Sequence, residues 1–248
     1  GIVGVVWFFV RQTRLERPML RVEVLRNRRF LVATVIGMLV QGALLAAGIL
    51  MPIYIQTLMG YSATVSGLVL MPGAVLMGIM NPIAGKLFDK HGPRKLGVIG
   101  MVLLTITTCG FALLTFATPI WFIAVLYTVR MFSMALVNMP ITTWGMNALD
   151  NKVMNHGTSV NNTLRQVAGS LGTAIIIAVS TQVQSFATPE FGSAQGTMFG
   201  INAAFLVCTL LCLVGLVMTI ALVKDKPGEE AAVDEGGARK SLLTAIMK

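Results

Sequence analysis

The sequence contains, at positions 30–56, the uncharged stretch FLVATVIGMLVQGALLAAGILMPIYIQ. As an α-helix this stretch would extend about 40 Å, enough to cross a hydrocarbon core of roughly 30 Å with some tilt. Lys and Arg are absent over 30–85, and also over 96–129 and 166–223. Uncharged, mostly apolar stretches of this length are typical of membrane-spanning helices.

The composition supports the same class of protein. Of the 248 residues, 55% are hydrophobic and 12% are charged, about half of the roughly 25% charge that is usual in soluble domains. The net charge of +9 could suggest a nucleic-acid partner, but a phosphate-binding surface needs its bases spread along a folded face. Here the bases lie between long uncharged stretches. The sequence therefore disfavours a soluble enzyme, a disulfide scaffold and a nucleic-acid-binding module, and it predicts an all-α integral membrane protein.

Six full spans are predicted between residues 30 and 223. Their approximate limits are 30–56, 66–85, 96–117, 120–143, 157–182 and 198–223. The ten apolar residues 1–10 reach only about 15 Å as a helix, so they are expected to end a further, preceding span. Residues 11–29 are expected to form a basic cytoplasmic linker, and residues 224–248 a disordered cytoplasmic tail.

Connections that contain basic residues alternate with connections that contain none. Residues 11–29 hold seven arginines and residues 86–95 hold four Lys or Arg, whereas the connections near Gly60 and Thr118 hold neither. An excess of Lys and Arg marks the cytoplasmic side of a membrane protein. We therefore expect a multi-pass protein of the cell membrane, with its C-terminus in the cytoplasm.

The stretch Gly85–Lys95 reads GKLFDKHGPRK. Gly92 and Pro93 are expected to form a tight turn between two helix ends, with Asp89 placed to cap or face a helix N-terminus. A simple cytoplasmic loop would explain the bases but not the single acid and the paired glycines. The stretch resembles the signature loop of the major facilitator superfamily, in which this loop acts as a gate latch. The gating residues that the resemblance implies are Gly85, Asp89, Lys90, Gly92, Arg94 and Lys95.

A second resemblance is more specific. Residues 138–149, 155–158 and 161–174 resemble the fourth-to-fifth span region in the C-terminal half of 14-span drug–proton antiporters, the EmrB/QacA type and its lincomycin-resistance branch. Residues 17–30 are similar to the linker that precedes that half. The resemblance implies a six-helix bundle made of two inverted three-helix repeats. It also implies a bacterial cell membrane as the location, and a missing N-terminal half, upstream of Gly1, as a partner.

Two arginines lie within predicted spans, where an unpaired charge is costly. Arg130 is expected either to serve a cavity or coupling role or to bond a backbone carbonyl as a structural partner. The family's fourth-helix motif would place Gln and Gly at the positions of Ser133 and Met134, which puts the first alternative in doubt. Arg165 is expected to line the inner mouth of a cavity. The candidate cavity or coupling residues are Arg130, Arg165, Gln41, Asn138, Asn161 and Asn162.

The function implied by the resemblance is multidrug efflux by proton antiport, with rocker-switch alternating access. The partners would be amphipathic drugs, protons and the lipid bilayer, with no cofactor, metal or nucleic acid. Every Asp and Glu lies outside the predicted spans, so the main proton acceptor is expected in the missing half. The alternatives are a carrier of another solute, such as a metabolite or siderophore, and a non-transporting scaffold or sensor. An intramembrane enzyme is disfavoured, because no His, Asp or Glu is predicted at membrane depth.

Overall fold

The computed structural model describes residues 22–150 and 153–223, and this part of the chain is helical. Six of its helices are long and apolar enough to cross a membrane, which confirms the predicted number of spans and the all-α membrane fold. The expected end of a preceding span (1–10), residues 11–21 of the expected linker and the expected tail (224–248) lie outside the described residues. The elements are η1 (Val22–Arg26), α2 (Arg28–Ile53), η2 (Tyr54–Leu58), α3 (Ala63–His91), α4 (Pro93–Ala112), α5 (Ile120–Met146), α6 (Met154–Phe191) and α7 (Ser193–Leu222).

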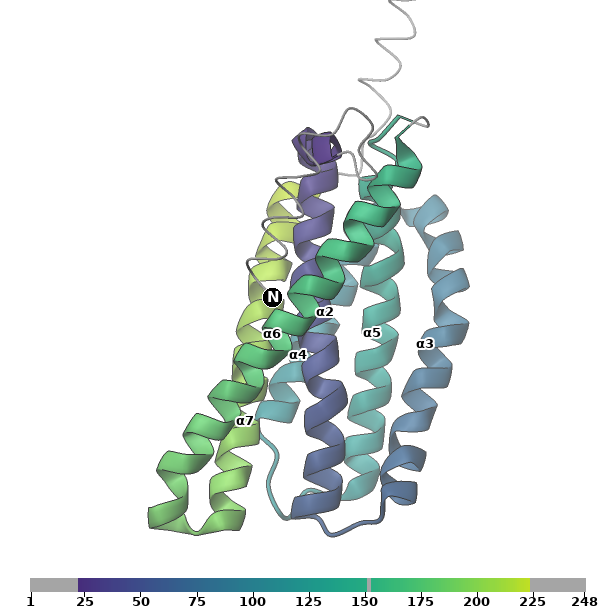
Figure 1. Cartoon of the computed structure of the whole chain (residues 1–248). Coiled ribbons are helices and arrows are strands. Elements are labelled where there is room, and N and C mark those ends of the chain that lie inside the picture. The colour runs from purple at the N-terminus through teal and green to yellow at the C-terminus, as the bar shows by residue number, and fades with distance from the viewer. Residues whose placement is uncertain (1–21, 151–152, 224–248) are drawn as a thin grey trace, which may run out of the picture.

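The helices form one bundle in which α6 crosses in front of α2 at a tilt, and α3 lies on the far side of α5 (Figure 1). Helix α2 packs mainly against α6, while α5 packs against both α3 and α4, and α7 packs against α4 and α6. Helices α2, α3 and α4 form one set of three, and α5, α6 and α7 form the other. The first helix of each set therefore packs against the second helix of the other set. This reciprocal pairing is what two inverted repeats would produce.

The start of α2 is fixed by Asn27, which lies at its N-cap. The Asn27 Oδ1 accepts hydrogen bonds from the backbone N–H groups of Arg29 (3.0 Å) and Phe30 (3.2 Å), the usual way to satisfy the free donors of a first turn. Its Nδ2 donates to the Ala148 carbonyl at 2.7 Å. The cap thus ties α2 to the end of α5, and it starts the helix at Arg28, two residues before the predicted span.

The predicted loop over residues 86–95 is almost entirely helical. Helix α3 continues to His91 and α4 begins at Pro93, so only Gly92 separates them. Gly92 has φ 78° and ψ 165°, a conformation that glycine adopts without a Cβ clash, and Pro93 suits the first position of a helix. The predicted turn is confirmed, but the predicted cap is wrong. Gly92 itself is the N-cap of α4 without a side-chain hydrogen bond, and Asp89 lies exposed in the last turns of α3.

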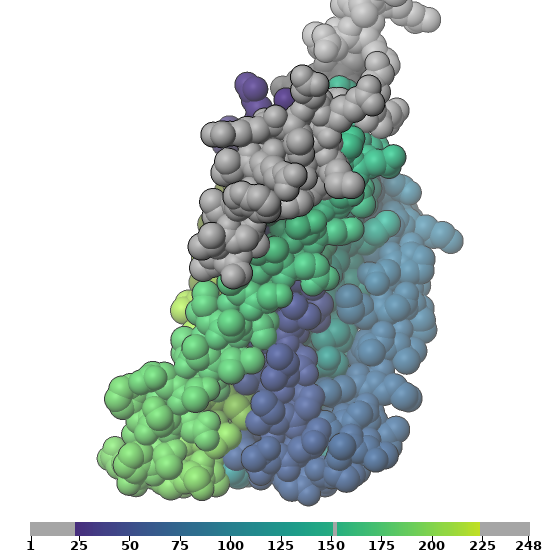
Figure 2. Space-filling view, viewed as in Figure 1, coloured from purple at the N-terminus to yellow at the C-terminus, as the bar shows by residue number. Residues whose placement is uncertain are grey.

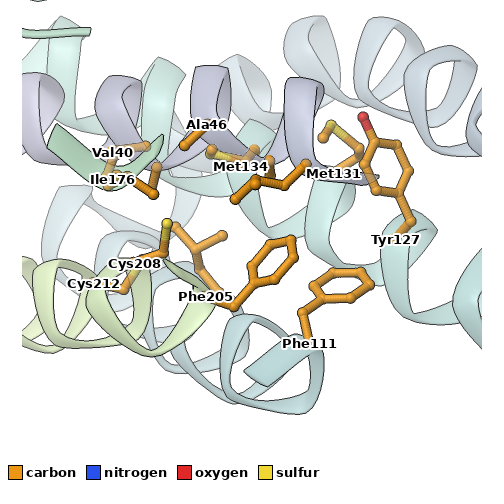
Figure 3. Packing of buried hydrophobic residues seen from close by; sticks show 14 of the residues in the cluster. Val40, Ala46, Phe111, Tyr127, Met131, Met134, Ile176, Phe205, Cys208 and Cys212 are labelled. Carbon is orange, nitrogen blue, oxygen red and sulfur yellow. The ribbon is translucent and has the colours of Figure 1, made fainter. Parts of the chain in front are cut away.

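The core of the bundle is apolar and lies where α2, α4, α5 and α7 meet (Figure 3). The rings of Phe111 and Phe205 face each other there, with centroids 5.2 Å apart. Cys208 and Cys212, one turn apart on α7, are 0% and 1% exposed, so they pack as small apolar side chains. Close packing of this core holds α5, the helix that carries Arg130.

Candidate functional site

Arg130 lies on α5 and is fully buried, at 0% exposure. Its Nη2 donates to the backbone carbonyl of Ala43 on α2 at 2.8 Å, and its Nε donates to the Thr108 Oγ1 on α4 at 3.4 Å. Its Nη1 is buried and has no hydrogen-bond partner among the described residues. Arg130 therefore joins three helices through a main-chain carbonyl and a hydroxyl. This is the arrangement expected if Arg130 is a structural partner of a backbone carbonyl.

Arg165 lies on α6 and is only partly buried. Its Nη2 donates to the Gln41 Oε1 on α2 at 3.1 Å and to the Asn138 Oδ1 on α5 at 2.6 Å. Its Nη1 donates to the Thr142 Oγ1, also on α5, at 3.4 Å. The structure thus brings three of the predicted cavity residues together and adds Thr142. We call these four residues the Arg165 cluster.

Space for the Arg165 side chain comes from glycine. A Cβ at Gly37 on α2 would lie 3.2 Å from the Arg165 Cδ and 3.4 Å from its Nε, so the arginine stem passes directly over this position. Further along the same crossing, a Cβ at Gly42 would lie 3.7 Å from the Gly172 Cα, and a Cβ at Gly169 would lie 3.0 Å from the Gln41 Cγ. The close approach of α2 and α6 therefore positions the cluster.

A groove of about 510 Å³ takes its walls from α2, α5 and α6, the three helices that carry the cluster. It is lined by Leu44, Leu45, Gly48, Ile49, Tyr127, Ser170 and Thr173. Figure 2 shows the surface of α2 exposed between α6 and α3 on this face of the molecule. We call this the α2–α6 groove. Its lining is mainly apolar, and its hydroxyl groups come from α5 and α6.

The remaining predicted cavity residues lie near Arg165 in sequence but not in the cluster. Asn161, one turn earlier on α6, is buried at 5% exposure, and Asn162 is exposed. Neither is joined to the cluster by a hydrogen bond that the described residues make. No sequence pattern singles out Gly37, because a single glycine in an apolar helix does not reveal which side chain passes over it.

The predicted gating residues lie at the end of the bundle where α3 ends and α4 starts. Arg94 is exposed on the first turn of α4, and its Nη2 donates to the Ile220 carbonyl on α7 at 3.3 Å. A cation at the last carbonyls of a helix is favoured by the helix dipole. Asp89 and Lys90 are exposed and Gly85 is half-buried. The signature stretch thus joins α3, α4 and α7 at one end of the bundle.

A family model described as the Major Facilitator Superfamily matches residues 1–173. The chain is 39% identical over 232 residues to YcnB, an uncharacterised MFS-type transporter of Bacillus subtilis, covering 93% of the chain and 49% of the relative. It is 31% identical to the lincomycin resistance protein LmrB of the same organism, covering 88% and 47%. It is 23% identical to the riboflavin transporter RibZ of Clostridioides difficile, covering 90% and 50%.

Among solved structures, a bacterial homologue of the human drug peptide transporters PepT1 and PepT2 has the same arrangement of helices. It matches with a TM-score of 0.66 at 16% identity, over 86% of this chain and 48% of that chain. At this identity the match concerns the fold alone. The chain spans about half the length of the curated relatives it matches.

Proposed function

The chain belongs to the Major Facilitator Superfamily, and we propose that it acts as the C-terminal half of a multidrug exporter driven by proton antiport. The likeness to LmrB, which is named for lincomycin resistance, supports drug efflux over other transport activities of the superfamily. The observation that carries the proposal is the meeting of Arg165, Gln41 and Asn138 beside the α2–α6 groove. A polar cluster beside an apolar groove is the usual composition of a small-molecule site.

In this proposal the groove faces the other half of the transporter and forms one wall of a central cavity. Rocking of the two halves would expose the cavity to each side of the membrane in turn. Within the described part of the chain, the four acids lie near helix ends or in connections; they are Glu23, Asp89, Asp150 and Glu190. The main proton acceptor is therefore assigned to the other half, and this half supplies a cavity wall and a gate.

The membrane orientation follows from the basic residues. The start of α2, the end of α3 and the start of α4 carry Arg28, Arg29, Lys90, Arg94 and Lys95. In Figure 1, η1 and the start of α2 lie at the same end of the bundle as the end of α3. By the positive-inside rule we assign this end to the cytoplasm, which makes the turn at Gly92 part of an inner gate.

The gate is tested by Asp89→Asn in the full-length protein. We expect loss of drug efflux at equal expression, because an exposed carboxylate at the end of α3 is proposed to hold the inner latch. The measurement is the minimum inhibitory concentration of a lincosamide in a transporter-deleted host. Glu190→Gln is the matched control, because it removes an exposed acid near the end of α6. Undiminished resistance with Asp89→Asn would overturn the latch.

A carrier of another solute is the second candidate, and the likeness to the riboflavin transporter RibZ favours it. It predicts solute-dependent growth in a transporter-deleted host without drug resistance. A non-transporting scaffold or sensor predicts neither effect. Purified full-length protein in liposomes would then show no proton movement when drug or solute is added. An antiporter would move protons across the membrane in the direction opposite to the solute.

A further inference from the structure

We infer that the Arg165 cluster and the α2–α6 groove together bind solutes that carry a carboxylate group. This inference rests on the proposed transport function and names a chemical class for its substrate. The amphipathic body would lie along the groove, and its anionic group would bind Arg165. Three features of the site support this: the charge of the cluster, its unused hydrogen-bond donors and its position near the groove.

The Arg165 cluster carries a full positive charge that its three partners do not neutralise. The acceptors of Gln41, Asn138 and Thr142 are two amide oxygens and a hydroxyl, which orient a guanidinium but carry no net charge. The middle sections of α2, α5 and α6 contain no Asp or Glu. A cation within a span is costly unless it meets a counter-charge or water, so the cluster as built favours an anion.

Arg165 also has hydrogen-bond donors that its three partners do not use. A guanidinium has five N–H donors, and the three bonds described above all leave from the terminal nitrogens Nη1 and Nη2. The Nε–H and one N–H of Nη1 make no hydrogen bond to the described residues. Arg130 differs, because it is fully buried while Arg165 is only partly buried. Arg165 is therefore the in-span cation that a ligand can reach.

The groove begins close to the cluster. Ser170 lies five residues after Arg165 on α6 and lines the groove, a rise of about 7.5 Å along the helix. On α2, Gln41 of the cluster precedes Leu44 and Leu45 of the groove wall by about one turn. A volume of about 510 Å³ lies within the usual range for small-molecule sites, roughly 300–1,000 Å³. An amphipathic carboxylate can thus contact both parts at once.

The carboxylate that Arg165 favours could come from the solute or from an acidic side chain in the rest of the transporter. We assign the carboxylate to the solute, and binding measurements distinguish the two sources. If an acid of the protein already neutralises Arg165, then a ligand carboxylate gains nothing from the arginine. Neutral and cationic ligands of the same shape would then bind as well as the anion.

The test uses purified full-length transporter in detergent and three probes with one aromatic body, namely 1-pyrenebutyrate, 1-pyrenebutanol and 1-pyrenebutylammonium. Isothermal titration calorimetry measures each Kd for the wild type, Arg165→Gln and Arg165→Lys. Arg26→Gln is the matched control, because it removes one exposed positive charge outside the cluster. Thermal unfolding of each variant by intrinsic fluorescence identifies any protein that is not folded.

We expect the wild type to bind pyrenebutyrate more tightly than the alcohol or the amine. Arg165→Gln should weaken pyrenebutyrate binding by about tenfold to a hundredfold, the range for a lost charge-assisted hydrogen bond, with little change for pyrenebutanol. Arg165→Lys should keep the preference for the anion at reduced affinity, because it retains the charge but not the fork of donors. Arg26→Gln should bind like the wild type.

Equal weakening of all three probes by Arg165→Gln would overturn the inference, and so would a wild type without preference for the anion. If Arg165→Gln does not fold, a reduced affinity of folded Arg165→Lys for pyrenebutyrate, at unchanged affinity for pyrenebutanol, supports the inference. An unchanged anion affinity in that variant overturns it. Binding requires neither proton coupling nor efflux. Absence of drug efflux together with a preserved anion preference would therefore contradict the proposed function alone.

Discussion

The two arginines within the spans differ in how the protein surrounds them. Arg130 is inaccessible and bonds a main-chain carbonyl and a threonine hydroxyl contributed by two other helices. Arg165 is partly accessible and bonds side-chain amides beside a groove. A main-chain carbonyl is held by its own helix, whereas amide side chains can rotate. The comparison indicates that Arg130 fixes the helix packing and that Arg165 is available to a ligand.

The largest expected effect is loss of the fold on replacing Arg130 with Ala. The change removes both interhelical hydrogen bonds and leaves a cavity in a fully buried site, at a cost of about 3 kcal/mol or more. The measurement is the fraction of full-length protein that stays monodisperse in size-exclusion chromatography after graded heating. Arg165→Ala should lower the midpoint temperature much less, because water can reach the groups it leaves behind. Equal losses for the two variants would contradict the comparison.

The same comparison shows what the sequence could and could not predict. The six spans follow from uncharged stretches, because only the membrane permits so many apolar residues in series. The sequence predicts Gln41 and Asn138 as cavity residues, but it does not predict their shared contact with Arg165. They lie 124 and 27 residues away from it along the chain. Which polar side chains meet depends on how helices rotate and cross, and a single sequence does not record that.

Two features at the ends of the helices also differ from the predictions. The predicted loop over residues 86–95 is occupied by the end of α3 and the start of α4. A single residue, Gly92, is enough to reverse the chain because it adopts a positive φ. Hydropathy places the end of the span at Gly85, where the charged residues begin. The helix itself continues to His91, because charged residues outside the membrane can still be helical. The sequence leaves two roles open for Arg130. Its bond to the Ala43 carbonyl agrees with the structural one.

A moderate effect is expected from Asn138→Leu, which removes the shortest hydrogen bond of the Arg165 cluster, at 2.6 Å. Gln41 still holds the guanidinium, so we expect pyrenebutyrate affinity to fall by roughly threefold to tenfold, the range for one hydrogen bond. The pyrenebutanol affinity should change less. Met139→Leu, at the exposed neighbouring position, is the control. Unchanged affinity for the anion would show that Asn138 does not orient Arg165.

The smallest effect is expected from Gly37→Ala. The added methyl group would lie 3.2 Å from the Arg165 Cδ and 3.4 Å from its Nε, closer than most carbon contacts, so the arginine stem must shift by a few tenths of an ångström. Crowding of this size alters orientation without breaking the fold. We expect pyrenebutyrate binding to weaken by roughly twofold, measured by calorimetry as above, while the thermal midpoint stays unchanged or rises slightly because alanine favours helix over glycine.

Gly78→Ala on α3 is the matched control for this change, because a Cβ there would meet no atom within 4 Å. It should bring the same gain in helix propensity and no change in binding. If Gly37→Ala and Gly78→Ala bind pyrenebutyrate equally well, the glycine does not set the position of Arg165. The guanidinium would then be held by its amide partners alone, and the difference between the two arginines would rest on their hydrogen bonds rather than on the close crossing of α2 and α6.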